Sequence, residues 1–227
     1  MHYLLAVAFI FALVLGPQIW VQHVMAKYNR KPEGNFPGNG SELARHLLDR
    51  FNLNRVKVEI SGQGDHYDPG TRSVRLTGDK YNGRTLTAIT TAAHEVGHAI
   101  QHASDDPLLR WRTRLVVVAS TSQKLGSFLL FAAPFLTLAT RAPSAGAITL
   151  LAAFLIMGMN VLVQLATLPV ELDASFKKAL PLLKAGYLTP EQHRAAERIL
   201  RAAAFTYLSA SLASLLNFWR WLRVLKR

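Results

Sequence analysis

The sequence of 227 residues contains no cysteine. This absence excludes disulfide bonds and every metal site that depends on thiolate ligands. A tightly held metal ion would therefore need histidine and carboxylate ligands. That ligand set is typical of catalytic sites, which keep one coordination position open, more than of closed structural sites.

Acidic residues are also scarce, with 14 Asp and Glu against 26 Lys and Arg, which gives a net charge of +12. An excess of this size can indicate a nucleic-acid partner. Here the basic residues gather beside apolar runs, at positions 27–31, 110–114 and 177–184, and they do not alternate with aromatic residues. Basic groups in such places flank membrane segments, so we predict no nucleic-acid binding.

Long apolar runs are abundant, at residues 3–25, 115–140 and 148–168, and each is long enough to cross a hydrocarbon core of roughly 30 Å. The first run lacks a preceding basic segment and a small-residue cleavage site. We therefore predict an uncleaved anchor with its N-terminus outside and the next loop in the cytoplasm. The lipid bilayer is thus a predicted partner.

A weaker apolar run covers residues 202–219 and precedes a basic C-terminal end. A fourth crossing would place those basic residues outside, against the usual preference for basic loops in the cytoplasm. The alternative is an amphipathic helix in the membrane interface, where Trp219 and Trp221 would lie at headgroup level. Both alternatives stay open.

Residues 94–98 read His-Glu-Val-Gly-His and fall in an apolar pattern of helical period that begins near Thr85. Two histidines four residues apart share one helix face, so both imidazoles can bind one metal ion. Glu95 is then placed to accept a proton from water activated by that ion. The spacing H-E-x-x-H is the pattern of zinc metalloproteases. It predicts one zinc ion, with His94 and His98 as ligands and Glu95 as general base.

A catalytic zinc ion takes three protein ligands, so one more is needed. His102 continues the series but lies roughly 12 Å from His94 along a straight helix, too far to share an ion. We prefer Glu171, because a carboxylate just after an apolar run is costly without a partner, and because a membrane hairpin returns it to the side of His94. Asp173 is the alternative ligand, or a group that orients a ligating histidine. Both acidic residues could instead stabilise the N-terminus of a helix.

The fold class predicted is a mainly α membrane protein, in which transmembrane helices accompany a small α+β region with a short β-hairpin or sheet. Ser41 is the predicted N-cap of an amphipathic helix that ends near residue 52. Strands are predicted at residues 56–60 and 73–76, with turns at 61–70 between them. The predicted divisions are an N-terminal anchor (1–26), a catalytic region (27–114), a transmembrane hairpin (115–168), a third-ligand segment with helices (169–201) and a transmembrane or interfacial C-terminal helix (202–227).

Five segments together resemble the bacterial YugP-type membrane zinc metallopeptidases, of the neutral zinc metallopeptidase family. They are Gly-Ser-Glu-Leu-Ala-Arg (40–45), Asp-His-Tyr-Asp-Pro (65–69), Tyr-Asn-Gly-Arg (81–84), the stretch around the histidines (92–101) and Leu-Pro-Val-Glu-Leu-Asp-Ala-Ser (168–175). The resemblance implies a zincin-like, gluzincin-like site, with Glu171 as third ligand, in a multi-pass protein of the bacterial inner membrane. Combined with the charge pattern, it predicts an active site that faces the cytoplasm. The segment at 168–175 also resembles a motif of HtpX-type proteases, in which an Asp follows the Glu by four residues; Asp173 follows by two.

In zincins, the strand before the active-site helix often pairs with an extended substrate, which predicts a sheet edge at residues 72–77. His66, Tyr67 and Arg84 are the candidates for lining the substrate cleft and for stabilising the oxyanion. His66, with Asp65, could equally close the turn between two strands.

The function predicted is that of an integral-membrane zinc endopeptidase, which hydrolyses peptide bonds of a peptide or protein substrate with a metal-activated water. One alternative is a catalytically silent zinc-binding membrane scaffold, although such a protein has no need for Glu95. The other is a metallohydrolase that acts on a bond other than the peptide bond. No pattern in the sequence indicates an oligomeric state.

Overall fold

The computed structural model describes residues 2–30 and 36–215. Residues 31–35 of the predicted catalytic region therefore fall outside the described residues, as does the C-terminal end of the predicted C-terminal helix, with Trp219 and Trp221. The chain divides into two compact units. The helical unit takes its described residues from 1–18, 111–167 and 207–227, and the mixed unit from 19–110 and 168–206.

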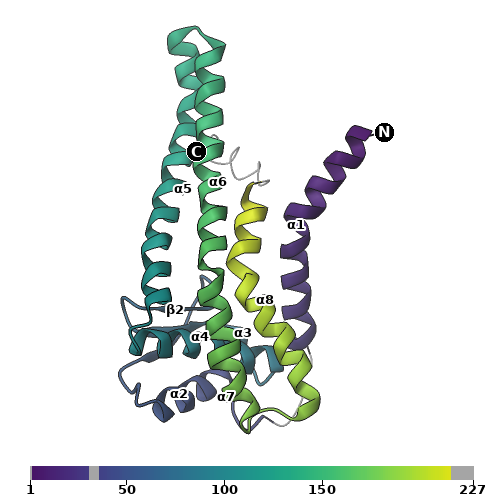
Figure 1. Ribbon diagram of the computed structural model, residues 1–227, viewed down its shortest axis with the longest axis vertical. Coiled ribbons are helices and arrows are strands. Elements are labelled where there is room, and N and C mark those ends of the chain that lie inside the picture. The colour runs from purple at the N-terminus through teal and green to yellow at the C-terminus, as the bar shows by residue number, and fades with distance from the viewer. Residues whose placement is uncertain (1, 31–35, 216–227) are drawn as a thin grey trace. The chain divides into compact units, whose positions relative to one another are not determined.

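The helical unit consists of parts of four long helices, α1 (His2–Asn29), α5 (Pro107–Thr140), α6 (Pro143–Leu172) and α8 (Pro190–Leu215). Helices α5 and α6 form an antiparallel hairpin that turns at residues 141–142 (Figure 1). Large apolar side chains of this hairpin are exposed, with Leu138 at 75% and Ile148 at 67%. Three helical segments, Phe9–Asn29, Pro107–Thr140 and Pro143–Lys184, are long and apolar enough to cross a membrane. The prediction of a mainly α membrane protein is therefore confirmed.

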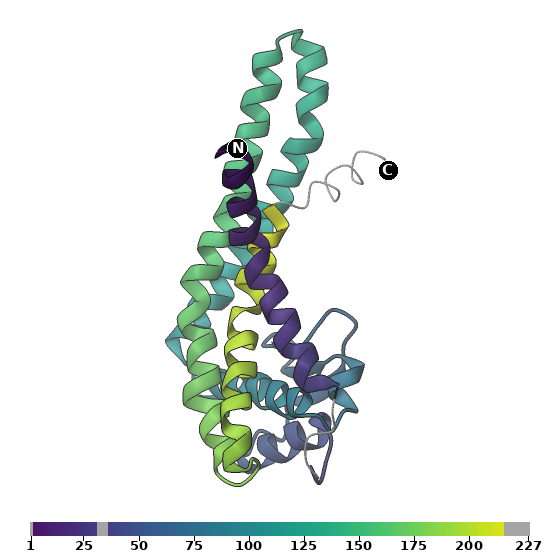
Figure 2. The ribbon, with the colours of Figure 1, turned by 90° about the vertical axis from the view of Figure 1, so that its right-hand side faces the viewer.

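The mixed unit builds its core around one helix, α4 (Leu86–Ala103), which packs against α2 (Gly40–Arg50) and against a π-helical segment, η1 (Asp173–Ala179). A short helix, α7 (Leu180–Lys184), continues η1, and the chain then reverses into α8 (Figure 2). The remaining helix is α3 (Gly78–Tyr81), just before α4. Because α4 is covered from several sides, every residue from Leu86 to Ala99 is buried. This explains why its apolar pattern predicted a helix clearly.

Helix α2 begins two residues earlier than predicted. Its N-cap is Asn39, whose side chain accepts a hydrogen bond from the Glu42 amide while the Glu42 carboxylate accepts one from the Asn39 amide. This reciprocal capping box satisfies two amides that would otherwise lack partners. The prediction of Ser41 as N-cap is therefore wrong, because the Ser41 hydroxyl instead bonds to Asn39.

The sheet has three strands in the order β1-β3-β2, where β1 is Lys57–Ile60, β2 is His66–Asp68 and β3 is Ser73–Leu76. Strand β3 pairs in parallel with β1 and antiparallel with β2. Both predicted strands are present, but β2 lies inside the stretch predicted as turns. The prediction of a free sheet edge at residues 72–77 is wrong, because β3 is the central strand.

Candidate metal centre

Three ligand-type side chains meet in the core of the mixed unit. His94 and His98 come from α4, and Glu171 comes from the last turn of α6. Glu171 Oε2 lies 3.4 Å from His94 Nε2 and 3.1 Å from His98 Nε2. All three side chains are at most 3% exposed, and among the described residues they form the one group whose ligand atoms could hold a metal ion. This group contains neither His102 nor Asp173.

The hydrogen bonds on the far side of each imidazole define its tautomer. The Nδ1 of His98 lies 2.9 Å from Gln101 Oε1, an atom that can only accept, so Nδ1 carries the proton. The Nδ1 of His94 lies 3.0 Å from the hydroxyl of Ser175, and that hydroxyl donates its single proton to the carbonyl of Leu200. His94 must therefore also donate from Nδ1. Both Nε2 atoms are left with lone pairs.

The arrangement fits a zinc ion. Two imidazole lone pairs and a carboxylate oxygen face one another in a buried space, and three such acceptors repel unless a cation or proton lies between them. Two nitrogen ligands at about 2.0–2.1 Å from a tetrahedral zinc ion are about 3.3 Å apart. The separations of 3.4 and 3.1 Å between Glu171 Oε2 and the two imidazole nitrogens are close to this spacing, and all three ligand atoms lie within 4.8 Å of one another. The donor set of two imidazoles and one carboxylate is that of several catalytic zinc sites.

Gln101 links the histidines to the segment that carries Glu171. Its amide nitrogen donates to the carbonyl of Val170 at 3.1 Å and to Asp173 Oδ2 at 2.8 Å, while its oxygen accepts from His98. Gln101 is fully buried. Asp173 thus acts on His98 through Gln101, and the Asp173 carboxylate also lies 3.6 Å from Lys177 and 3.8 Å from Lys178.

The backbone of η1 approaches α4 closely at Gly97. A Cβ atom at this position would lie 2.8 Å from the carbonyl oxygen of Ala174, closer than real Cβ contacts. A glycine between the two histidines therefore allows the segment with Asp173 and Ser175 to reach them.

The helical backbone continues from α6 through η1 into α7, and Leu172 has α-helical dihedral angles. The segment η1 begins at Asp173 within this continuous helical backbone, so neither Glu171 nor Asp173 lies at a free helix N-terminus, which disfavours the alternative in which they stabilise one. A π-helical segment is a rare element that occurs often at functional sites. Pro169 lies just upstream and removes one hydrogen bond of α6.

The predicted cleft residues occupy different places. Tyr67 is 4% exposed, and its hydroxyl lies 2.7 Å from His102 Nδ1. Burial raises the pKa of Tyr67 to about 12, so its hydroxyl stays protonated at neutral pH. His66 Nδ1 lies 3.2 Å from the carbonyl of Gly64 within the same turn, and Arg84 is exposed in the loop before α4.

Asp65 holds the turn before β2 against the end of β3. Its Oδ1 accepts from the amide and the hydroxyl of Thr77 at 2.7 and 2.9 Å, and its Oδ2 lies 3.3 Å from the Lys80 ammonium. These contacts favour the turn-closing role that was one of the two alternatives for Asp65.

Sequence reasoning missed Gln101 and Ser175. Gln101 is seven residues after His94 and three after His98, and therefore shares their helix face. Ser175 is four residues after Glu171. A search for polar residues at these spacings would have found both. Their acceptors are the backbone carbonyl groups of Val170 and Leu200, which no pattern of side chains in the sequence indicates.

Comparisons with known proteins identify a family and a relative of this chain. A family model described as "Putative neutral zinc metallopeptidase" matches residues 3–226. A curated protein of Bacillus subtilis (strain 168), the "Putative membrane protease YugP", is 33% identical over 225 residues, which covers 95% of this chain and 96% of that protein. No solved structure matches. With nearly its whole length matched, the chain belongs to the family described as putative neutral zinc metallopeptidases.

Proposed function

We propose that this protein is an integral-membrane zinc endopeptidase, with His94, His98 and Glu171 as the zinc ligands and Glu95 as the general base. The observation that carries the proposal is the pair of Nδ1-protonated histidines whose Nε2 atoms face the Glu171 carboxylate. The family, described as putative neutral zinc metallopeptidases, supports peptide hydrolysis as the reaction.

A bound zinc ion polarises a carbonyl group and lowers the pKa of water, so that hydrolysis proceeds at neutral pH. Glu95 accepts the proton of the attacking water on its carboxylate and returns it to the leaving amine. Gln101 and Ser175 hold the two imidazoles in the tautomer that offers Nε2. The burial of Glu95, at 5% exposed, keeps bulk water from competing for its proton.

The membrane placement follows from the helices and the basic residues beside them. Lys27 lies in the last turn of the first candidate span and Arg30 follows that span, and Arg110, Arg112 and Arg114 lie in the first turns of α5. Positive charge beside a span marks its cytoplasmic end. We therefore place the metal centre at the cytoplasmic face of a bacterial plasma membrane.

The test measures bound metal and casein cleavage on the purified full-length protein. Glu95→Gln should keep about one zinc ion per chain and lose about 10²–10⁴-fold in turnover, the usual contribution of a general base. Glu171→Ala should lose both the metal and cleavage. Glu191→Gln, in the exposed first turn of α8, is the matched control and should change neither.

Four results would contradict parts of the proposal. Full turnover by Glu95→Gln would remove this residue as base, and a well-folded wild type without metal would remove the zinc centre. Retained metal in Glu171→Ala together with metal loss in Asp173→Ala would move the third ligand to Asp173. If the wild type binds zinc but leaves casein and synthetic peptides intact, the protein is a scaffold or acts on another bond.

A further inference from the structure

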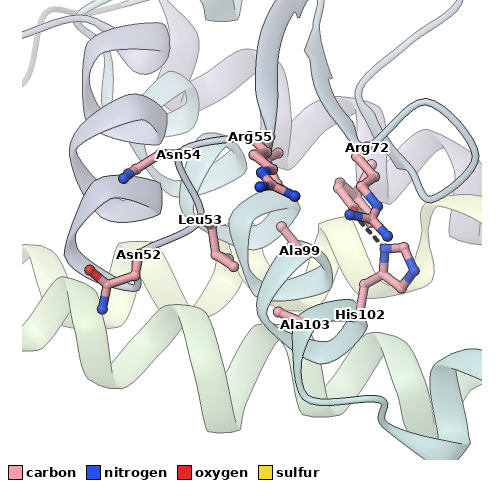
Figure 3. A pocket seen from close by; sticks show the side chains of 10 residues that line it. Asn52, Leu53, Asn54, Arg55, Arg72, Ala99, His102 and Ala103 are labelled. Carbon is pink, nitrogen blue, oxygen red and sulfur yellow. Dashed lines mark hydrogen bonds between the residues drawn. The ribbon is translucent and has the colours of Figure 1, made fainter.

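A pocket of about 410 Å³ lies beside the C-terminal half of α4, within the mixed unit. Figure 3 shows Arg55 and Arg72 reaching toward α4 from two different loops, with Ala99 and His102 on the helix side. Arg55 precedes β1 and Arg72 lies in the turn between β2 and β3. The pocket thus brings together two arginines from separate loops and a histidine from α4.

The charge of this pocket is uncompensated. Neither Arg55 nor Arg72 forms an ion pair in the part of the chain that the structure describes, and no Asp or Glu lines the pocket. Nearby arginines behave differently, since Arg45 pairs with Asp49 at 2.7 Å and Arg75 with Asp68 at 3.0 Å. Two free guanidiniums beside an imidazole form a site for a carboxylate, which guanidinium binds through paired hydrogen bonds.

The backbone around the pocket is held in costly conformations. Asn52 and Arg72, which both line it, have φ angles of 57° and 50°. Such left-handed dihedral angles are uncommon for residues other than glycine and concentrate at functional sites. For Arg72 the conformation directs a long charged side chain toward α4 (Figure 3).

The wall of the pocket lies on the same helix face as the proposed base. Glu95, Ala99 and His102 are spaced by four and three residues, so they follow one another along α4. Glu95 and His102 are separated by roughly 10 Å along the axis at 1.5 Å per residue. An extended peptide covers that length with about three residues.

We propose that this pocket is a subsite of the peptidase that binds a carboxylate of the substrate, about three residues from the cleaved bond. The inference rests on the proposed function, because the face shared with Glu95 makes the pocket part of the peptide path. Two peptide groups carry this chemistry, an Asp or Glu side chain and a C-terminal carboxylate.

The first measurement is cleavage of internally quenched peptides that differ by Glu or Gln at one position, each with a free or an amidated C-terminus. Wild type should favour the peptide with the carboxylate in kcat/KM by roughly tenfold, the scale of one or two hydrogen bonds to a charged group. A preference at an internal Glu identifies a side chain, and a preference for the free terminus identifies the terminal carboxylate. Arg55→Gln and Arg72→Gln should abolish the preference while cleavage of the neutral peptide stays unchanged. Arg198→Gln, which removes an exposed arginine of α8, should keep it.

The second measurement separates the pocket from the chemistry. Fluorescence anisotropy measures binding of the same peptides to the zinc-loaded Glu95→Gln protein. Binding should show the same preference for the peptide with the carboxylate. The double variant Glu95→Gln/Arg72→Gln should lose that preference. Charge-selective binding by a protein that cleaves no peptide would support the pocket and reject the peptidase. Cleavage without any charge preference, or a preference that survives both arginine substitutions, would overturn the pocket and leave the peptidase intact. Arginine-dependent binding of phosphatidylglycerol nanodiscs, without charge preference among peptides, would also overturn it and assign the pocket to lipid headgroups.

Discussion

Gln101 shows how a single uncharged side chain can organise a metal centre. Its amide oxygen accepts a hydrogen bond from His98, while its amide nitrogen donates hydrogen bonds to the Asp173 carboxylate and the Val170 carbonyl. Hydrogen bonds of this kind orient a ligating imidazole and raise its basicity. The Asp173 carboxylate and the Gln101 amide therefore act together on the proposed ligand His98, although neither contacts the position of the metal ion.

We expect Gln101→Met to weaken zinc binding by about 10–100-fold, because methionine fills the space but leaves the Nδ1 proton of His98 without its acceptor and removes the amide donor of the Asp173 carboxylate. Competition with a zinc chelator measures the affinity. Gln63→Met, in the exposed turn before β2, is the control and should bind zinc like the wild type. Equal affinity in the two variants would show that Gln101 serves packing alone.

Tyr67 predicts a dependence of stability on alkaline pH. Its pKa is raised from 10.0 to about 12, chiefly by burial, so the unfolded chain releases the proton first as the pH rises. This contribution to the free energy of unfolding is complete below pH 10 and disappears between about pH 10 and 12. The loss is at most about 3 kcal/mol, since one pKa unit corresponds to about 1.4 kcal/mol.

Denaturant unfolding of wild type and Tyr67→Phe at pH 8 to 12 tests this dependence. The difference in stability between the two proteins should shrink as the pH rises above 10. Parallel curves for wild type and Tyr67→Phe would mean that the folded Tyr67 ionises like an exposed tyrosine.

At the residue scale, the sequence predicted that His94 and His98 lie close together, because residues four apart share one face of a helix. Glu171 followed from the cost of a carboxylate beside an apolar run. Gln101 and Ser175 did not follow, because their roles depend on backbone carbonyls 69 and 25 residues away. Only a fold brings such groups together.

Among the elements, the contact between α4 and η1 is the one on which the site depends. Gly97 faces the Ala174 carbonyl where the two backbones meet. We expect Gly97→Ala to cost about 1–3 kcal/mol in the free energy of unfolding, the range for overpacking a core, and to weaken zinc binding because η1 must move away from the histidines.

Thermal unfolding and zinc titration of the same samples measure both effects. Gly78→Ala is the matched control, since Gly78 begins α3 and an added Cβ there meets nothing within 4 Å. A Gly97→Ala protein with unchanged zinc affinity would show that η1 can shift without disturbing the ligands.

Element prediction failed where the pattern was short. Strand β2 has only three residues and is bordered by Gly64 and Pro69, so alternation had no length over which to appear. Its pairing with β3 turned the predicted edge into the central strand. For α2, a stronger capping group two residues upstream displaced Ser41, because Asn39 and Glu42 satisfy each other's amides.

For the whole molecule, the three apolar segments and the absence of cysteine allow a direct test of membrane topology. If α5 and α6 cross the bilayer as a hairpin, the turn at residues 141–142 lies on the side opposite the metal centre. Single cysteines at two exposed serines, Ser104→Cys at the end of α4 and Ser144→Cys at the start of α6, report the two sides.

In intact cells, a membrane-impermeant maleimide should label Ser144→Cys and leave Ser104→Cys unreacted until the membrane is permeabilised. The wild type, which has no cysteine, supplies the background. The reverse pattern would place the metal centre outside the cytoplasm. Labelling of both sites in intact cells would argue against a hairpin that spans the bilayer.

The positions of the proposed ligands in the sequence also determine when, during synthesis of the chain, the proposed activity can begin. His98 and Glu171 are separated by 73 residues, a stretch that includes both helices of the apolar hairpin. A ribosome that adds about 5–20 residues per second needs roughly 4–15 s to travel from the second histidine to the glutamate. During synthesis the growing chain therefore carries two histidines and a base without the third ligand. If the protein is the proposed peptidase, its activity begins only after the hairpin has been made.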